Sequence, residues 1–163
     1  LTQNLDFNKA LSVIAKDKEK LVQIIAYCLM PTHIHLILKQ SVDRGISIFM
    51  GNILNSYTRY FNTIHTRKGP LWESKFKNVL VENDEQLLHL TRYLHLNAVT
   101  ASLINKPELW KYSSFNEYLS EDEDPICVFN DILEVQPSTY KKFVNDRIAY
   151  QKQLSKIKKL IID

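Results

Sequence analysis

The stretch Met30-Pro31-Thr32-His33-Ile34-His35-Leu36-Ile37-Leu38 predicts a turn followed by a buried β-strand that carries two histidines. Pro31 has no backbone N–H to give to a sheet, so it marks the turn. Side chains alternate along a strand, and His33 and His35 therefore project from the same side. Both imidazoles can reach one ion, while the apolar residues between and after them sit in or near the core. Two histidines do not fill a coordination sphere, so further ligands must come from elsewhere in the chain.

The segments on either side of this strand predict a hairpin and a helix. Residues 21–30 form an apolar, β-branched run that is typical of a strand, and the proline turn joins it to the histidine strand. Before it, apolar residues recur at helical spacing over residues 7–20. The chain begins at Leu1 and not at Met, and we expect one further strand upstream of it.

A long helix is expected after the hairpin, over residues 46–64, because seven apolar residues fall on one helical stripe. Tyr57 lies in the middle of that stripe, and we assign it to the core. Lys68-Gly69-Pro70 ends the helix, and residues 76–81 return as a strand with Lys75 and Lys77 beside it.

The next helix begins at Asn83, where Gln86 three residues later predicts a capping box. Its buried stripe is formed by Leu87, Leu90, Leu94 and Ala98. Tyr93 and Asn97 are neighbours one turn apart, roughly 80° from the centre of that stripe. A tyrosine there is either half-buried packing or a hydroxyl presented to whatever the sheet carries, and Asn97 is a candidate for a third, oxygen ligand.

The C-terminal part of the chain is expected to form a helical extension. Ser114 with Glu117 predicts a capping box that opens a short helix. Residues 121–124 are expected to form an acidic surface loop, and Ser138 is expected to cap a final helix. The whole order predicts an α+β fold, with a ferredoxin-like (RRM-like) antiparallel sheet and helices on one face, if a strand precedes Leu1. Residues 120–163 are expected to pack on the same domain.

Composition is that of one globular domain whose charge is unevenly spread. The 163 residues are 45% hydrophobic and 24% charged, with a net charge of +3. Residues 55–80 hold five basic residues against one acidic, whereas residues 120–136 hold six acidic residues and none that is basic. Such segregation fits either a basic surface for a polyanion or a solvated face.

Cys28 and Cys127 lack zinc-site spacing and fit a reducing compartment, and no membrane-spanning run or signal peptide is visible, so we expect a cytoplasmic protein.

Three blocks in the sequence resemble a known family. The His33-Ile34-His35 strand is similar to the His-hydrophobic-His motif of the HUH superfamily of single-strand DNA nickases. Residues 26–36, Gly69-Pro70-Leu71-Trp72 with Phe76, and Arg92-Tyr93-Leu94-His95-Leu96-Asn97 resemble, in the same order, segments of single-tyrosine transposases, which include insertion-sequence and REP-associated enzymes. The likeness covers about residues 8–119. Thr32 and Ala98 depart from the asparagine or aspartate and the proline that are common there, and neither change removes a ligand.

The resemblance implies a metal-dependent enzyme that nicks and rejoins single-stranded DNA during transposition. Tyr93 would be the nucleophile, giving a 5′-phosphotyrosine intermediate, and His33, His35 and Asn97 would hold Mg²⁺ or Mn²⁺. Residues 1–119 would be the catalytic domain, and the partner would be single-stranded or hairpin DNA. Smaller members work as homodimers that complete each other's sites, whereas longer-tailed ones act as monomers.

Two alternatives and a set of DNA contacts stay open. A non-catalytic relative would only recognise hairpin DNA or RNA, and a His-x-His metallohydrolase would use bound water instead of a tyrosine. Candidate phosphate contacts are Arg59, Lys75, Lys77 and Arg92, each of which also fits a solvated charge. Trp72 is a candidate for stacking on an unpaired base, with plain packing as the alternative.

Overall fold

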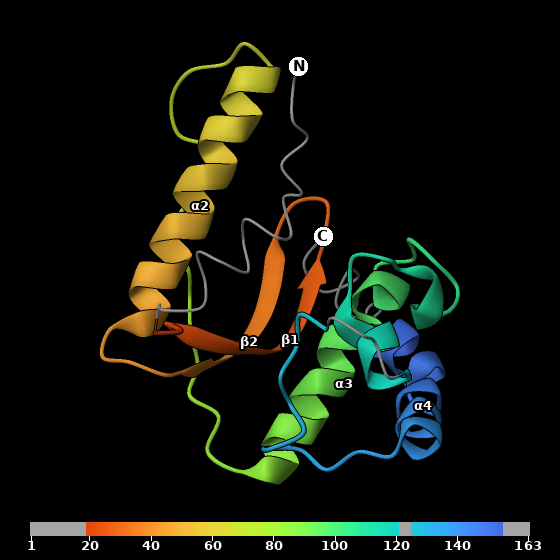
Figure 1. Cartoon of the computed structure of the whole chain (residues 1–163). Coiled ribbons are helices and arrows are strands. Elements are labelled where there is room, and N and C mark those ends of the chain that lie inside the picture. The colour runs from red at the N-terminus through yellow and green to blue at the C-terminus, as the bar shows by residue number, and fades with distance from the viewer. Residues whose placement is uncertain (1–18, 121–124, 155–163) are drawn as a thin grey trace, which may run out of the picture.

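The computed structural model describes residues 19–120 and 125–154. Along the chain the elements are β1 (Val22–Leu29), β2 (Ile34–Gln40), α2 (Gly45–Ile64), α3 (Asp84–Thr100), η1 (Pro107–Leu109), η2 (Ser114–Tyr118) and α4 (Pro137–Asn145). Figure 1 shows the two strands between α2 on one side and α3 with α4 on the other. The mixed α+β class is confirmed. The helix expected over residues 7–20 lies almost wholly outside the described residues.

The predicted hairpin is present. β1 and β2 pair antiparallel, with Cys28 opposite His35 and Leu29 opposite Ile34. The Met30 backbone N–H donates to the His33 carbonyl at 2.8 Å and closes the turn. His33 therefore lies immediately before β2, in the closing pair of the hairpin.

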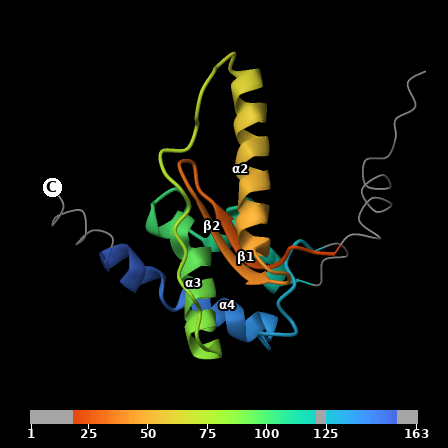
Figure 2. The ribbon, with the colours of Figure 1, turned by 90° about the vertical axis from the view of Figure 1, so that its left-hand side faces the viewer.

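Helix α2 confirms the long helix, but the assignment of Tyr57 to the core is wrong. Gly45 begins the helix where a Cβ would collide with the Leu21 carbonyl, so the chain enters α2 tightly against the start of β1. The helix then runs past the hairpin turn, as both views show (Figures 1 and 2). Tyr57 is 46% exposed, and its ring contacts Trp72 from the segment after α2 instead of the core.

The strand expected over residues 76–81 is also wrong. The chain from the end of α2 to the start of α3 has no strand and runs down the side of the molecule (Figure 2). Val79 and Leu80 are consecutive and 86% and 79% exposed, so the alternation that buries one face of a strand is missing. The sheet of the described residues thus has two strands, and the ferredoxin-like architecture is confirmed only in part.

Helix α3 starts as its sequence predicts. Asn83 is the N-cap, and its side-chain oxygen accepts a hydrogen bond from the Gln86 N–H at 2.8 Å. The Gln86 side chain accepts in return from the Glu82 N–H at 2.7 Å. The first bond satisfies a donor that the first helical turn leaves free, the second holds the residue before the N-cap, and together they set where α3 begins.

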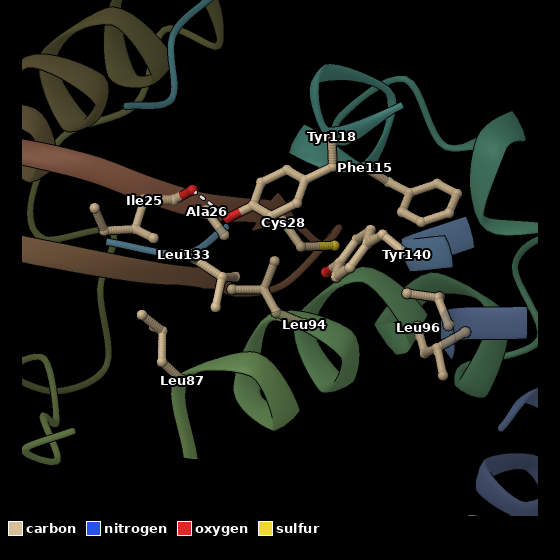
Figure 3. Packing of buried hydrophobic residues seen from close by; sticks show 11 residues of the cluster. Ile25, Ala26, Cys28, Leu87, Leu94, Leu96, Phe115, Tyr118, Leu133 and Tyr140 are labelled. Carbon is tan, nitrogen blue, oxygen red and sulfur yellow. Dashed lines mark hydrogen bonds between the residues drawn. The ribbon is translucent and has the colours of Figure 1, made fainter. Parts of the chain in front are cut away.

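The core lies between β1, α3 and the C-terminal segments (Figure 3). Its buried members come from every one of these elements: Ile25, Ala26, Cys28, Leu87, Leu94, Leu96, Phe115, Tyr118, Leu133, Tyr140 and Val144. The Tyr118 hydroxyl donates to the Ile25 carbonyl at 2.8 Å, which satisfies a polar atom inside this cluster. Burying an aromatic or aliphatic side chain of this kind contributes about 1.5–3 kcal/mol, so the late segments stabilise the helix they cover.

Two details of the C-terminal prediction differ. The cap of η2 is Ser113, whose hydroxyl accepts from the Phe115 N–H, because Ser114 points into the core instead. The last predicted helix begins at Pro137, with Gln136 as an N-cap that makes no side-chain bond, and a turn at residues 146–147 separates it from helical residues 148–154.

The acidic loop 121–124 lies outside the described residues, and the boundary at residue 119 stays a prediction. None of the helices in the described ranges is both long and apolar enough to cross a bilayer.

Candidate active site

Three aromatic rings from two elements converge beside the hairpin turn. The rings of His33 and His35 stand nearly perpendicular with their centroids 4.7 Å apart. The Tyr93 ring lies 6.4 Å from the His35 ring at an interplanar angle of 78°. Tyr93 is 45% exposed, so its hydroxyl is open to a ligand in solvent.

Strand register explains why His35 meets α3. Residues directly opposite in an antiparallel pair share a face, and His35 is opposite Cys28. Cys28 is fully buried and its thiol contacts the backbone of Ala98 on α3, so this face of the hairpin is the one that α3 covers. Burial raises the pKa of Cys28 to about 11, which keeps the thiol protonated and unsuited to metal binding at neutral pH.

Asn97 follows Tyr93 by one helical turn and is buried. Its side-chain Nδ2 is shielded from solvent and has no hydrogen-bond partner among residues 19–120 and 125–154. The two ends of an amide have the same shape, and an unpaired buried end costs about 1–3 kcal/mol. In the flipped arrangement of this amide, the unpaired buried atom is the Asn97 oxygen, which a bound cation would satisfy.

The donor set suits a divalent cation. Two imidazole nitrogens and one amide oxygen are ligands that Mn²⁺ or Mg²⁺ accepts, and they leave coordination positions open. No group of three or more His, Cys, Asp or Glu residues gathers around one point in the part of the chain that the structure describes. Asn97 is therefore the residue on which a three-ligand site depends.

Burial and a neighbouring hydroxyl favour metal binding by the two imidazoles. Burial, followed by the neighbouring His33, lowers the pKa of His35, so this ring is neutral at pH 7. The Thr32 hydroxyl lies 3.0 Å from Nδ1 of His33. When that Nδ1–H donates to Thr32, the other nitrogen, Nε2, carries the free lone pair that a metal needs. Sequence reasoning gave Thr32 no role, and its position next to the first histidine was the available signal.

The candidate DNA contacts lie apart from the three rings. Arg59, Lys75 and Lys77 are exposed on α2 and on the segment that follows it. Trp72 packs against α2, where its Nε1–H donates to the Leu54 carbonyl at 3.2 Å. Within the described residues no hydrogen bond, ion pair or ring contact joins any of these four side chains to the histidines or to the tyrosine.

Arg92 faces α4 and not the histidines. Its guanidinium lies over the Phe143 ring, 4.1 Å from the centroid, and Nη2 is 2.7 Å from Nδ1 of His89. Burial, with the nearby Arg147, lowers the pKa of Arg92. These contacts attach the tyrosine helix to α4.

His95 is a buried polar residue of α3 to which the sequence analysis gave no role. It is 1% exposed, and its Nδ1 and Nε2 lie 2.8 Å from the Tyr140 hydroxyl and 2.9 Å from the Ser114 hydroxyl. Burial lowers its pKa to about 3, so the ring is neutral. The signal in the sequence was its place at i+4 from Thr91, beside the apolar stripe of the helix.

Comparison with known proteins finds similarity to transposases. The profile of a family described as "Transposase IS200 like" matches residues 3–97. A Haemophilus influenzae protein named REP-associated tyrosine transposase is 25% identical over 104 residues, which cover 58% of this chain and 59% of that protein. The chain thus matches less than two thirds of the length of this relative. No solved structure matches the chain.

Proposed function

The chain belongs to the IS200-like transposase family, and from this premise we propose that it nicks and rejoins single-stranded DNA with Tyr93 as nucleophile. The observation that carries the proposal is the half-exposed Tyr93 phenol beside the ring of His35. A buried tyrosine would serve only in packing. A tyrosine far from the histidines would lie away from the proposed metal site and from the phosphate bound there. The relative named a tyrosine transposase supports the same reading.

The proposed step is a transesterification at phosphorus. The Tyr93 oxygen attacks a DNA phosphodiester, the bond from phosphorus to O3′ breaks, and the phenol proton ends on the leaving O3′. The products are a 5′-phosphotyrosine and a free 3′-hydroxyl. Attack by a 3′-hydroxyl reverses the exchange and returns the proton to Tyr93, so rejoining needs no external energy source.

We propose that His33, His35 and Asn97 hold a divalent cation, Mg²⁺ or Mn²⁺. When bound, such an ion polarises the phosphate and offsets the charge that develops on it. The protein itself supplies a neutral His35, a Thr32 hydroxyl beside Nδ1 of His33, and a buried Asn97 whose Nδ2 has no hydrogen-bond partner among the described residues. Tyrosine has an ordinary pKa of about 10, so this assistance is what a phenol nucleophile requires near neutrality.

The substrate that we propose is single-stranded or hairpin DNA. Arg59, Lys75 and Lys77 are exposed, and we propose them as phosphate contacts that make binding fall steeply with salt. Trp72 and Arg92 are engaged in packing contacts, so we give them a secondary part in DNA binding. The contact between Tyr93 and His35 of one chain supports a site formed within one copy, and a homodimer stays the alternative proposal.

The test is formation of a covalent protein–DNA adduct. A labelled single-stranded hairpin oligonucleotide is incubated with the protein and Mn²⁺ and run on a denaturing gel. We expect an adduct from the wild type, no adduct from Tyr93→Phe, and an undiminished adduct from Tyr60→Phe, an exposed tyrosine on α2.

Other outcomes identify the alternatives. Cleavage that survives Tyr93→Phe without any adduct would indicate a metallohydrolase that uses water. Binding of the hairpin without cleavage under any metal condition would indicate a recognition protein. Either result would contradict the tyrosine mechanism.

A further inference from the structure

The buried histidine of the tyrosine helix has no part in the chemistry above. His95 lies two residues after Tyr93 and two before Asn97. Successive residues of an α-helix are about 100° apart, so His95 lies about 160° around the axis from each of them, while Tyr93 and Asn97 are within about 40° of each other. The contacts of His95 therefore hold the back of α3 while the other two residues face the hairpin.

Both ring nitrogens of His95 have a hydroxyl partner. The Ser114 hydroxyl accepts from the Tyr27 N–H at 2.9 Å and lies 3.2 Å from the Tyr27 carbonyl, to which it can donate its one proton. In the tautomer that matches this arrangement, His95 Nε2–H donates to Ser114 and Nδ1 accepts from the Tyr140 hydroxyl. Both nitrogens of the neutral ring are then satisfied.

This chain of bonds ends at the strand pair that carries the other half of the site. Tyr27 precedes Cys28, the residue opposite His35 in the hairpin. Hydrogen bonds thus run from α3 through Ser114 to β1 at Tyr27, one residue before the partner of His35, while Tyr140 holds the same ring from α4. A rotation or slide of α3 would break them.

We propose that His95 is a positioning residue which, with Ser114 and Tyr140, fixes the rotation of α3 so that Tyr93 and Asn97 face His35. The expected loss of reaction rate rests on the proposed function. The expected change in the position of Tyr93 does not. A rotation of about 10° moves a group 5–6 Å from a helix axis by about 1 Å. A misplacement of about 1 Å can lower a reaction rate about 100-fold, so small losses of register matter at Tyr93.

The variants are chosen to loosen the network without touching the site. Tyr140→Phe removes the donor to Nδ1, and Ser114→Ala removes the link to β1. Tyr118→Phe is the matched control, because Tyr118 loses an equally buried hydroxyl from the same aromatic cluster but bonds to the Ile25 carbonyl and not to α3. All three are made in the full chain, and their folding is checked by circular dichroism.

Two measurements are made on each variant. The first is the single-turnover rate of adduct formation with a single-stranded hairpin oligonucleotide and Mn²⁺, beside the Kd for the same oligonucleotide. The second is the ¹⁹F spectrum of protein labelled with 3-fluorotyrosine, in which Tyr93→Phe identifies the Tyr93 signal. The spectrum needs neither metal nor DNA.

We expect Tyr140→Phe and Ser114→Ala to move or broaden the Tyr93 signal and to lower the adduct rate about tenfold or more, with Kd within twofold of the wild type. Tyr118→Phe should leave the signal and the rate within twofold. The proposal is overturned if the Tyr93 signal and rate are unchanged in both network variants, or if Tyr118→Phe has the same effect as Tyr140→Phe. If the wild type forms no adduct, the proposed function fails, and the fluorine spectra alone decide whether His95 positions the helix.

Discussion

Acidification should destabilise this protein through His95, and the size of the effect follows from its burial. The folded pKa of His95 is lowered from the ordinary 6.5 to about 3 because the ring is desolvated. The unfolded chain therefore binds a proton at this position before the folded chain does as pH falls. The stabilising contribution is fully present above pH 6.5 and is lost progressively as pH falls toward 3.

The free energy of unfolding should fall between pH 7 and pH 5 because of this difference in proton binding. At pH 7 the difference in proton binding is small, and at pH 5 the unfolded ring is almost fully protonated while the folded ring is not. Linkage gives a loss of about 2 kcal/mol in the free energy of unfolding between these values. The result changes little for any folded pKa below about 4, since the unfolded pKa then sets it.

Urea unfolding at pH 7 and pH 5, followed by tryptophan fluorescence, measures this loss. The decisive quantity is the pH-dependent loss in the wild type minus that in His95→Gln, which cannot titrate. His65→Gln, a change at an exposed histidine, is the matched control and should keep the wild-type loss within about 0.5 kcal/mol. Equal losses in the wild type and in His95→Gln would refute the description of His95 as a buried neutral ring.

Three further predictions concern the fold and the metal site. Gly45→Ala should lower the free energy of unfolding by about 1–3 kcal/mol because the new Cβ meets the Leu21 carbonyl, whereas Gly51→Ala in the same helix meets nothing and should raise it by about 0.5–1 kcal/mol, both measured by urea denaturation. Asn83→Ala should cost about 1 kcal/mol by thermal denaturation because it removes the cap of α3; an unchanged Tm would contradict the capping role. Asn97→Ala should weaken Mn²⁺ binding about tenfold or more, measured by electron paramagnetic resonance; unchanged affinity would remove Asn97 from the ligand set.

Local signals in the sequence predicted the parts of the fold that depend on neighbours along the chain. Pro31 and the apolar runs on either side of it predicted the hairpin, and Asn83 with Gln86 predicted the start of α3. In each case the interacting atoms are a few residues apart. The spacing of Tyr93 and Asn97 on one helix also followed from helical geometry alone.

Contacts between distant segments explain the errors. The helical stripe of α2 placed Tyr57 among apolar residues, but periodicity does not tell which part of a stripe has a partner, and the outer half of this one is exposed. A strand at residues 76–81 would need a neighbouring strand edge, and none pairs with it in the described ranges. His95 was missed because its partners Ser114 and Tyr140 are 19 and 45 residues away in sequence.

The convergence of the site was a prediction of the same distant kind, which strand and helix spacing suggested and the family resemblance implied. The ring contact between His35 and Tyr93 joins residues from the hairpin and from α3. Helical spacing placed Tyr93 on a shoulder of α3, but only the packing of α3 on the hairpin decides what that shoulder faces. The roles of these residues remain proposals that chemistry must test.

The most direct test is to identify the amino acid that carries DNA after the reaction. Protein incubated with a single-stranded hairpin oligonucleotide and Mn²⁺ is digested with nuclease and trypsin, and the modified peptide is sequenced by tandem mass spectrometry. The account predicts a 5′-phosphonucleotide on the phenol oxygen of Tyr93, in the peptide that begins directly after Arg92. A nucleotide on any other tyrosine, or cleaved DNA with no modified peptide, would contradict it.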